Sequence, residues 1–209
     1  MENPKSFGQL LIITAPSGAG KTSLIKSLLK TEDQLQVAVS HTTRPIRPGE
    51  REGSDYFFVS KESFRKQREA GEFFESAEVF GHLYGTGIKD LETRLSSGVD
   101  VILEIDWQGA KQVKSQVSHS VWIFIAPPSI NALQTRLETR GQDSRHTIND
   151  RMSAAREEIS HWQDADYLIV NDLFDVALAQ LRSIVTVMRL STSRKKDSVT
   201  SLMNDLLTK

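Results

Sequence analysis

The chain has 209 residues, of which 38% are hydrophobic and 25% are charged, so length and composition predict a soluble globular protein with one substantial core. The formal net charge of −1 excludes a general affinity for polyanions such as nucleic acid, so any phosphate recognition must be local. The absence of cysteine excludes disulfides, thiolate catalysis and Cys-based zinc sites, and no apolar run is long enough to cross a membrane, so we expect a cytoplasmic protein.

Apolar runs in the N-terminal half alternate with segments that have a helical pattern. In chain order, the patterns predict a strand at residues 10–14, a helix at 23–30, strands at 36–42 and 55–59, a helix at 61–70, short strands within 73–87 and a helix at 88–97. Residues 36–89 depart from a regular alternation of strands and helices. We therefore expect a small mixed lobe inserted there.

The C-terminal half returns to the alternation. The patterns predict a strand at 99–106, a helix at 109–116, a strand at 121–126, a helix capped by Ser129, a long helix at 147–161, a strand at 167–171 and a helix at 174–190. Buried strands joined by helices are typical of a parallel sheet covered by helices on both faces. The polar tail, residues 191–209, carries one apolar ridge and predicts either a docking helix or a frayed end.

A phosphate-binding loop follows the first predicted strand. The chain there reads Ala15, Pro16, Ser17, Gly18, Ala19, Gly20, Lys21 and Thr22. This is the pattern GxxxxGK(S/T) with Ala15 in place of the first glycine, so Ala15 must adopt an ordinary backbone conformation. Two glycines let backbone N–H groups approach phosphates closely. Lys21 can bridge the β- and γ-phosphates of a nucleotide, and the Thr22 hydroxyl can ligate Mg²⁺. The positive end of the next helix points at the same phosphates.

The predicted lobe at residues 36–89 carries residue types that bind a phosphate monoester. Arg44 and Arg47 lie three residues apart, and their guanidinium groups suit phosphate oxygens. Tyr56 and Tyr84 can add phenolic donors. Taken alone, the arginines could belong to a solvated loop and the tyrosines to the core. Their occurrence together with a phosphate loop favours a phosphate clamp.

The motifs, in their order and spacing, resemble those of the guanylate kinase family, whose members phosphorylate GMP from ATP. The segments that carry the resemblance are residues 15–22, 40–47, 53–58, 74–75, 84–86, 105–109 and 169–172. The resemblance implies a P-loop core of helices and parallel strands at residues 1–35, 90–127 and 162–190, a GMP-binding lobe at 36–89, a helical lid at 128–161 and a C-terminal tail at 191–209. The alanine at position 15 is associated with bacterial members.

The resemblance also implies which residues hold GMP. The expected GMP-binding residues are Ser40, Arg44, Arg47, Tyr56, Glu75, Tyr84, Thr86 and Asp106. Guanine presents N1–H and the N2 amine as adjacent donors, and the carboxylate of Glu75 can accept from both. Adenine has no N1–H, so it would leave that carboxylate unpaired and be rejected. Without the resemblance, Glu75 would be interpreted as an exposed strand carboxylate.

Arginines are frequent between residues 136 and 156, in the segment that the resemblance marks as a lid over ATP. The expected catalytic residues are Lys21, Arg44, Arg136, Arg140 and Arg151. Phosphoryl transfer needs positioning and positive charge rather than a protein nucleophile. Residues 15–22 and Asn171 are expected to bind ATP, with Asn171 near the adenine. Mg²⁺ is expected at Thr22, held largely by nucleotide phosphates and water, with Glu104 beside its water shell. A solvated pair of charged helices is the alternative interpretation of the arginines.

Three other functions compete with this hypothesis. Residues 106–109 match the DxxG motif of GTPases, but the stretch at 171–174 lacks the lysine of their base-reading motif. A non-catalytic scaffold would be expected to lose the phosphate loop, which this chain keeps. A kinase for another nucleoside monophosphate is disfavoured by Glu75 and Asp106. The sequence leaves the oligomeric state open, including a homo-oligomer.

Overall fold

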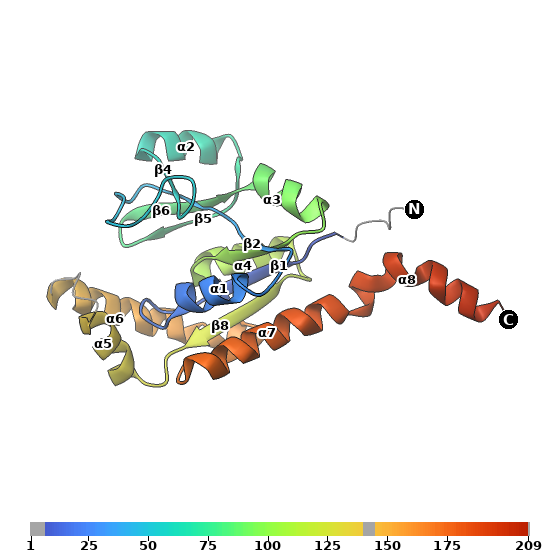
Figure 1. Cartoon of the computed structure of the whole chain (residues 1–209). Coiled ribbons are helices and arrows are strands. Elements are labelled where there is room, and N and C mark those ends of the chain that lie inside the picture. The colour runs from blue at the N-terminus through green and yellow to red at the C-terminus, as the bar shows by residue number, and fades with distance from the viewer. Residues whose placement is uncertain (1–6, 140–144, 209) are drawn as a thin grey trace.

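The core of the protein is a parallel sheet of five strands in the order β2–β7–β1–β8–β9. The computed structural model describes residues 7–139 and 145–208, and Figure 1 shows how the elements are arranged. The strands are β2 (Leu35–Val37), β7 (Asp100–Glu104), β1 (Leu10–Thr14), β8 (Val121–Ala126) and β9 (Tyr167–Val170). The α/β class predicted from the sequence is confirmed.

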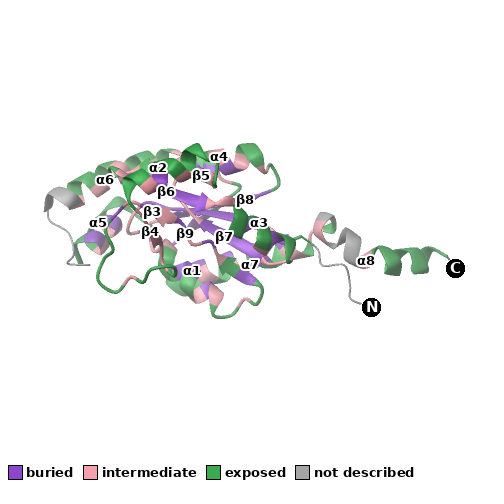
Figure 2. Ribbon diagram, turned by 90° about the horizontal axis from the view of Figure 1, so that it is seen from above, coloured by how far each residue is buried: buried purple, intermediate pink, exposed green. Residues whose placement is uncertain are grey.

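Helices cover both faces of this sheet. Leu11 and Ile13 of β1 pack in one apolar cluster with α1 (Lys21–Leu29) and α7 (Phe174–Leu190). Leu10 and Ile12, on the opposite face of the same strand, pack in a second cluster with α3 (Ile88–Ser96) and α4 (Trp107–Gln116). Side chains alternate along a strand, so a strand as apolar as β1 is stable only when both faces are covered. Figure 2 shows the buried strands at the centre of the molecule.

A second sheet of four strands, in the order β4–β3–β6–β5, lies above the core in Figure 1. Its strands are β3 (His41–Thr42), β4 (Phe57–Phe58), β5 (Phe73–Val79) and β6 (His82–Gly87). Strands β3 and β4 are parallel and the other pairs are antiparallel, so the sheet is mixed. Helix α2 (Lys61–Glu69) packs on it through the fully buried Phe64, whose ring stacks on Phe73 with centroids 4.4 Å apart.

The single strand predicted at residues 36–42 is wrong, because the structure divides this segment between the two sheets. Strand β2 ends at Val37 and β3 begins at His41. The backbone N–H of Ala38 donates to Ile102 in the core, whereas the carbonyl of Ser40 accepts from Phe57 in the second sheet. The hydrogen-bonding partner thus changes within a continuous run of residues that favour strands. Ser40 consequently lies where the chain passes from one sheet to the other.

Helices α5 (Ile130–Thr139) and α6 (Arg145–Ser160) form a pair at the same end of the molecule as the second sheet (Figure 1). They pack on each other through Leu133, Leu137 and Ala155, which are buried. The side chain of Ser129 caps α5, as predicted, by accepting a hydrogen bond from the N–H of Ala132 at 3.0 Å. This pair occupies the segment in which the sequence predicts a lid.

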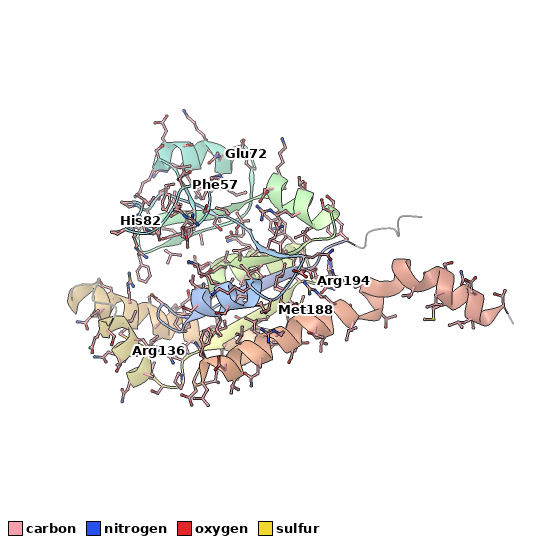
Figure 3. The ribbon with its side chains drawn as sticks, viewed as in Figure 1. Phe57, Glu72, His82, Arg136, Met188 and Arg194 are labelled. Atoms are coloured by element: carbon pink, nitrogen blue, oxygen red, sulfur yellow. The ribbon has the colours of Figure 1, made fainter. Side chains whose placement is uncertain are left out.

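The C-terminal tail forms a helix, α8 (Thr192–Leu207), that leads away from the core (Figure 1). Its beginning is tied down by Arg194, labelled in Figure 3, whose guanidinium lies 2.5 Å from the buried carboxylate of Asp100. Its apolar ridge is exposed, with Leu206 at 63% and Leu207 at 82%. Within the described part of the tail, the helix is held to the core at its start and is exposed over residues 201–207. No helix among the described residues is long and apolar enough to span a membrane.

Candidate active site

One cavity of about 500 Å³ brings together most of the predicted site residues. Its walls come from the loop after β1, the second sheet, the connection between β7 and α4, and helix α6. The predicted residues that line it are Ala15, Pro16, Ser17, Gly18, Gly20, Lys21, Thr22, Ser40, Arg47, Tyr56, Glu75, Tyr84, Asp106 and Arg151. Residues as far apart as 15 and 151 therefore surround one space large enough for a nucleotide.

The phosphate loop between β1 and α1 has the backbone that its glycines predict. Gly18 and Gly20 have φ values of 96° and 95°, in the left-handed region. Among the described residues, the only non-glycine residues with positive φ are Gln34 and Phe80, so Ala15 has the ordinary conformation that was expected. Gly20 is also needed for space, because a Cβ there would lie 2.3 Å from the side-chain nitrogen of Asn171.

The side chains of Asn171 and Arg136 both donate hydrogen bonds to the backbone of this loop. The buried amide of Asn171 donates to the carbonyl of Ala19 at 2.7 Å. Arg136, labelled in Figure 3, donates to the backbone carbonyls of Asn171 at 2.9 Å and Ala19 at 3.4 Å. Both residues were expected at the ATP site. The structure places the Asn171 amide on the backbone of the phosphate loop, and it places the Arg136 guanidinium between this loop and the backbone of Asn171.

Lys21 and Thr22 begin helix α1 beside the end of strand β7. The Lys21 ammonium donates to the carbonyl of Ile105 at 3.1 Å. The Thr22 hydroxyl donates to the carboxylate of Glu104 at 2.5 Å. A hydroxyl and a carboxylate are the hard oxygen ligands that Mg²⁺ prefers, so these residues fit the expected ion. The described residues contain no group of three or more His, Cys, Asp or Glu that could hold a metal by themselves. Such an ion would therefore also need phosphate and water oxygens.

Arg44, Tyr56 and Tyr84 lie together at the second sheet. The Arg44 guanidinium lies 5.5 Å from the centre of the Tyr56 ring, and the two tyrosine rings are 6.0 Å apart, edge to face. Burial raises the pKa of the Tyr56 phenol, and the charge of Glu104 raises it further, so Tyr56 stays a hydrogen-bond donor. Tyr56 and Tyr84 bring phenolic groups to the cavity wall, whereas Arg44 does not line the cavity and contacts their cluster from outside it.

Glu50 is a residue of this cluster that the sequence analysis missed. Its carboxylate accepts two hydrogen bonds from Arg44, at 2.8 and 3.0 Å, and one from the backbone N–H of Arg47 at 2.8 Å. Burial raises the pKa of Glu50, but the hydrogen bonds from Arg44 and Arg47 outweigh this effect and lower it overall. Glu50 thus orients Arg44 and neutralises part of its charge. Its position six residues after Arg44 was the only signal in the sequence.

A second group of polar side chains is buried, and two of its members, Ser40 and Glu75, line the cavity. Glu75 is 3% exposed, and its carboxylate accepts a hydrogen bond from the hydroxyl of Thr86 at 2.7 Å. The Thr86 hydroxyl lies 3.2 Å from that of Ser40. Burial raises the pKa of Glu75 to about 7, the Thr86 hydrogen bond lowers it and the charge of Asp106 raises it. Three of the four residues expected to bind guanine, Ser40, Glu75 and Thr86, thus form one connected group, and the fourth, Asp106, acts on Glu75 through its charge.

Asp106 caps helix α4 rather than ending strand β7, because β7 stops at Glu104 and the helix begins at Trp107. Its carboxylate accepts from the N–H of Gly109 at 2.9 Å and from the side chain of Gln108 at 3.0 Å. This capping fixes the position of the Asp106 carboxylate at the start of helix α4.

Helix α6 contributes Arg151 to the cavity wall. It also contributes Glu158, which the sequence analysis did not assign to the site. One carboxylate oxygen of Glu158 is buried and has no hydrogen-bond partner among the described residues. Burial raises the pKa of Glu158 to about 7, with Lys21 opposing and Asp106 adding to the shift. Arg140, the remaining predicted catalytic residue, lies outside the described residues.

Known proteins that are similar to this chain identify its family. Residues 7–188 match the family model described as guanylate kinase. The chain belongs to the guanylate kinase family. A guanylate kinase from Hahella chejuensis is 56% identical over 186 residues, which cover 89% of each chain. A guanylate kinase from Legionella pneumophila (strain Lens) is 47% identical over 200 residues, which cover 96% of each chain.

A solved structure of a guanylate kinase has the same fold. The crystal structure of guanylate kinase from Anaplasma phagocytophilum matches with a TM-score of 0.77 at 36% identity, and the match covers 91% of this chain and 90% of that one. Membership of the guanylate kinase family confirms the resemblance that the motifs indicated. The family match includes the phosphate loop, the second sheet and helices α5 and α6.

Proposed function

We propose that this guanylate kinase family member transfers the γ-phosphoryl group of ATP to GMP, giving ADP and GDP, and that dGMP also serves as acceptor. The observation that carries the proposal is that a phosphate loop and a buried carboxylate, Glu75, face the same cavity. The first suits a nucleoside triphosphate, and the second suits a base that offers adjacent donors. A reaction between a triphosphate donor and a guanine nucleotide acceptor uses both features.

The ATP side of the proposed site is built on the phosphate loop. Backbone N–H groups of residues 15–22 would surround the phosphates, with Lys21 bridging the β- and γ-phosphates. We propose that Arg136 and Asn171 serve ATP by holding this loop, since both donate to its backbone. Arg151, and Arg140 outside the described residues, would bring positive charge from the lid.

The GMP side divides into a phosphate clamp and a base site. Arg44, Arg47, Tyr56 and Tyr84 would hold the GMP phosphate. Glu75 would accept from N1–H and the N2 amine of guanine, with Ser40, Thr86 and Asp106 completing the base site. We propose that residues 36–89 form the GMP-binding lobe and residues 128–161 the lid, and that both close over the core when the two nucleotides are bound.

In the proposed reaction, an oxygen of the GMP phosphate attacks the γ-phosphorus in line with the bridging oxygen of ADP. The new P–O bond forms as the bond to the bridging oxygen breaks, and ADP leaves with that electron pair. Lys21 and the arginines stabilise the charge that spreads over the transferred group. Mg²⁺, held by Thr22 and near Glu104, would neutralise further charge on the phosphate oxygens. Closure of the lid excludes the water that would otherwise hydrolyse ATP.

The experiment that tests this function measures ADP release with ATP, Mg²⁺ and each of GMP, dGMP, AMP and UMP. We expect turnover with GMP and dGMP alone. Preference for AMP or UMP would overturn the assignment of Glu75 and Asp106 to guanine. Measurable GMP binding without turnover for any acceptor would favour a binding module over an enzyme.

The raised pKa of Glu75 predicts that the affinity for guanine falls in acid. Guanine needs the ionised carboxylate, so below pH 7 binding must first remove a proton, and Kd is expected to rise about tenfold per pH unit. Calorimetric titration with guanosine between pH 5.5 and 8 measures this without interference from the phosphate group. A Glu75→Gln variant should show weak binding that is flat with pH, and an equally steep profile in this variant would contradict the assignment.

The raised pKa of Glu75 also predicts that the free energy of unfolding changes with pH in the opposite direction to the affinity for guanosine. The folded-state pKa of Glu75 lies above the unfolded value, so its contribution to stability is fully present below the unfolded pKa and is lost as pH rises through about 7. Between pH 6 and 8, the free energy of unfolding should fall slightly while guanosine affinity rises. Urea unfolding across this range checks the sign, with Glu75→Gln as the control.

A further inference from the structure

The carboxylate of Glu75, which is expected to bind guanine, lies against the first turn of helix α4. This helix packs on the five-stranded sheet, whereas Glu75 belongs to the four-stranded sheet. Glu75 belongs to β5, whereas Asp106 and Gly109 belong to the start of α4. A Cβ atom at Gly109 would lie 2.5 Å from the Oε2 atom of Glu75 and 3.3 Å from its carboxyl carbon. Any side chain at position 109 would therefore occupy the space in which the Glu75 carboxylate sits. Gly109 also donates its N–H to Asp106, so both carboxylates meet at this residue.

A row of glutamines along α4 holds β5 in this place. The row is made of Gln108, Gln112 and Gln116. Gln112 accepts a hydrogen bond from the N–H of Ser76 at 3.1 Å and donates to its carbonyl at 2.9 Å. The other two glutamines donate to backbone carbonyls two residues before and two residues after Ser76. Gln116 donates to the carbonyl of Phe74 at 3.0 Å, and Gln108 donates to the carbonyl of Glu78 at 3.4 Å. Three successive turns of one helix thus bind the backbone of one strand.

The geometry of the two elements explains this match. Strand β5 is an edge strand, so every second residue turns its backbone N–H and C=O away from the sheet. Four residues of a helix rise about 6 Å, and two residues of a strand extend about 6.6 Å. Glutamines four residues apart therefore reach backbone groups two residues apart, and Gln112 pairs with Ser76 as a neighbouring strand would.

We propose that α4 is the element that positions Glu75 for guanine recognition, through Gln112 at the strand edge and the missing side chain of Gly109. Both are positioning residues, since neither lines the cavity. The proposal rests on the proposed function, because it explains how the Glu75 carboxylate is held in position to bind guanine in that reaction. It adds that discrimination between bases depends on a contact between the core helix and the second sheet.

The first test is Gly109→Ala, with Gly87→Ala as a matched control. We expect the KM for GMP to rise at least about tenfold, with the KM for ATP within about twofold, because the Glu75 carboxylate is displaced and the Ile105 side chain, 3.2 Å from the new Cβ, needs to move only slightly. The higher helix propensity of alanine should offset part of the cost of moving the buried carboxylate, so the variant should remain folded. A Cβ at Gly87 would meet its nearest neighbour, His41, at an ordinary 3.7 Å, so this variant should keep both KM values.

The second test replaces Gln112. Gln112→Glu keeps the shape and the acceptor for the Ser76 N–H, but it loses the donor and places a charge against the Ser76 carbonyl. We expect the KM for GMP to rise severalfold in Gln112→Glu and in Gln112→Ala, with the KM for ATP nearly unchanged. Ser115→Ala, on the exposed side of the same helix, should behave as wild type. This variant series keeps the proposal testable if Gly109→Ala does not fold.

The outcomes separate the proposal from the proposed function. A wild-type protein without GMP kinase activity would overturn the proposed function. An active wild type with unchanged GMP KM in Gly109→Ala and Gln112→Ala would overturn the positioning role of α4 and leave the function intact. An equal rise in both KM values would also overturn it, since that pattern indicates general damage.

Discussion

Lys21→Ala is expected to lower the turnover of ATP and GMP by about a hundredfold or more, while the protein keeps its fold. Removing one preorganised group that stabilises developing charge typically costs two to three orders of magnitude, roughly 10²–10³ in kcat. In the structure the Lys21 ammonium donates a hydrogen bond to the carbonyl of Ile105, and Lys21 lines the cavity. Its loss should therefore remove positive charge from the phosphate site and leave the core packing of α1 intact.

The measurement is steady-state ADP release together with thermal unfolding. Lys30→Ala is the matched control, because Lys30 lies at the C-terminal end of the same helix and is exposed. This control should keep wild-type turnover. Wild-type turnover in Lys21→Ala would remove Lys21 from the mechanism. A large fall in melting temperature would show instead that the loss of activity comes from unfolding.

Glu75→Gln is expected to raise the KM for GMP by about ten- to a hundredfold, with a much smaller effect on the KM for ATP. The glutamine offers one acceptor and one N–H₂ group where guanine presents two donors, so one donor is left unpaired in a buried site. Such a group costs about 1–3 kcal/mol. The same N–H₂ group can donate to N1 of adenine, so the preference for GMP over AMP should shrink as well.

Kinetics with each substrate varied in turn measure this split. Glu72→Gln, an exposed carboxylate just before β5, is the control and should change neither KM. Equal rises in the KM for GMP and for ATP would remove Glu75 from the base site. An unchanged ratio of GMP to AMP activity would show that other residues choose the base.

The phosphate loop could be predicted from the sequence because all its parts are contiguous. The strand at Leu10–Thr14, the two glycines and Lys21 follow one another, and each has a local physical reason to be there. The buried strands and most helices could be predicted for the same reason, since apolar periodicity is a property of a single segment. Family resemblance then extended the prediction to Glu75 and the arginines.

The tertiary structure alone decided how these segments meet. Three contacts leave no periodic signal in the sequence. They are the change of hydrogen-bond partners after Val37, the hydrogen bond from Asn171 to Ala19 and the hydrogen bonds from Arg44 to Glu50. Gln112 and Ser76 are ordinary polar residues until α4 lies along the edge of β5. Such contacts depend on the packing of distant segments, whose energy is set by the whole fold. The sequence by itself therefore determined which chemical groups the site contains, and the packing of the fold decided how those groups are positioned relative to one another.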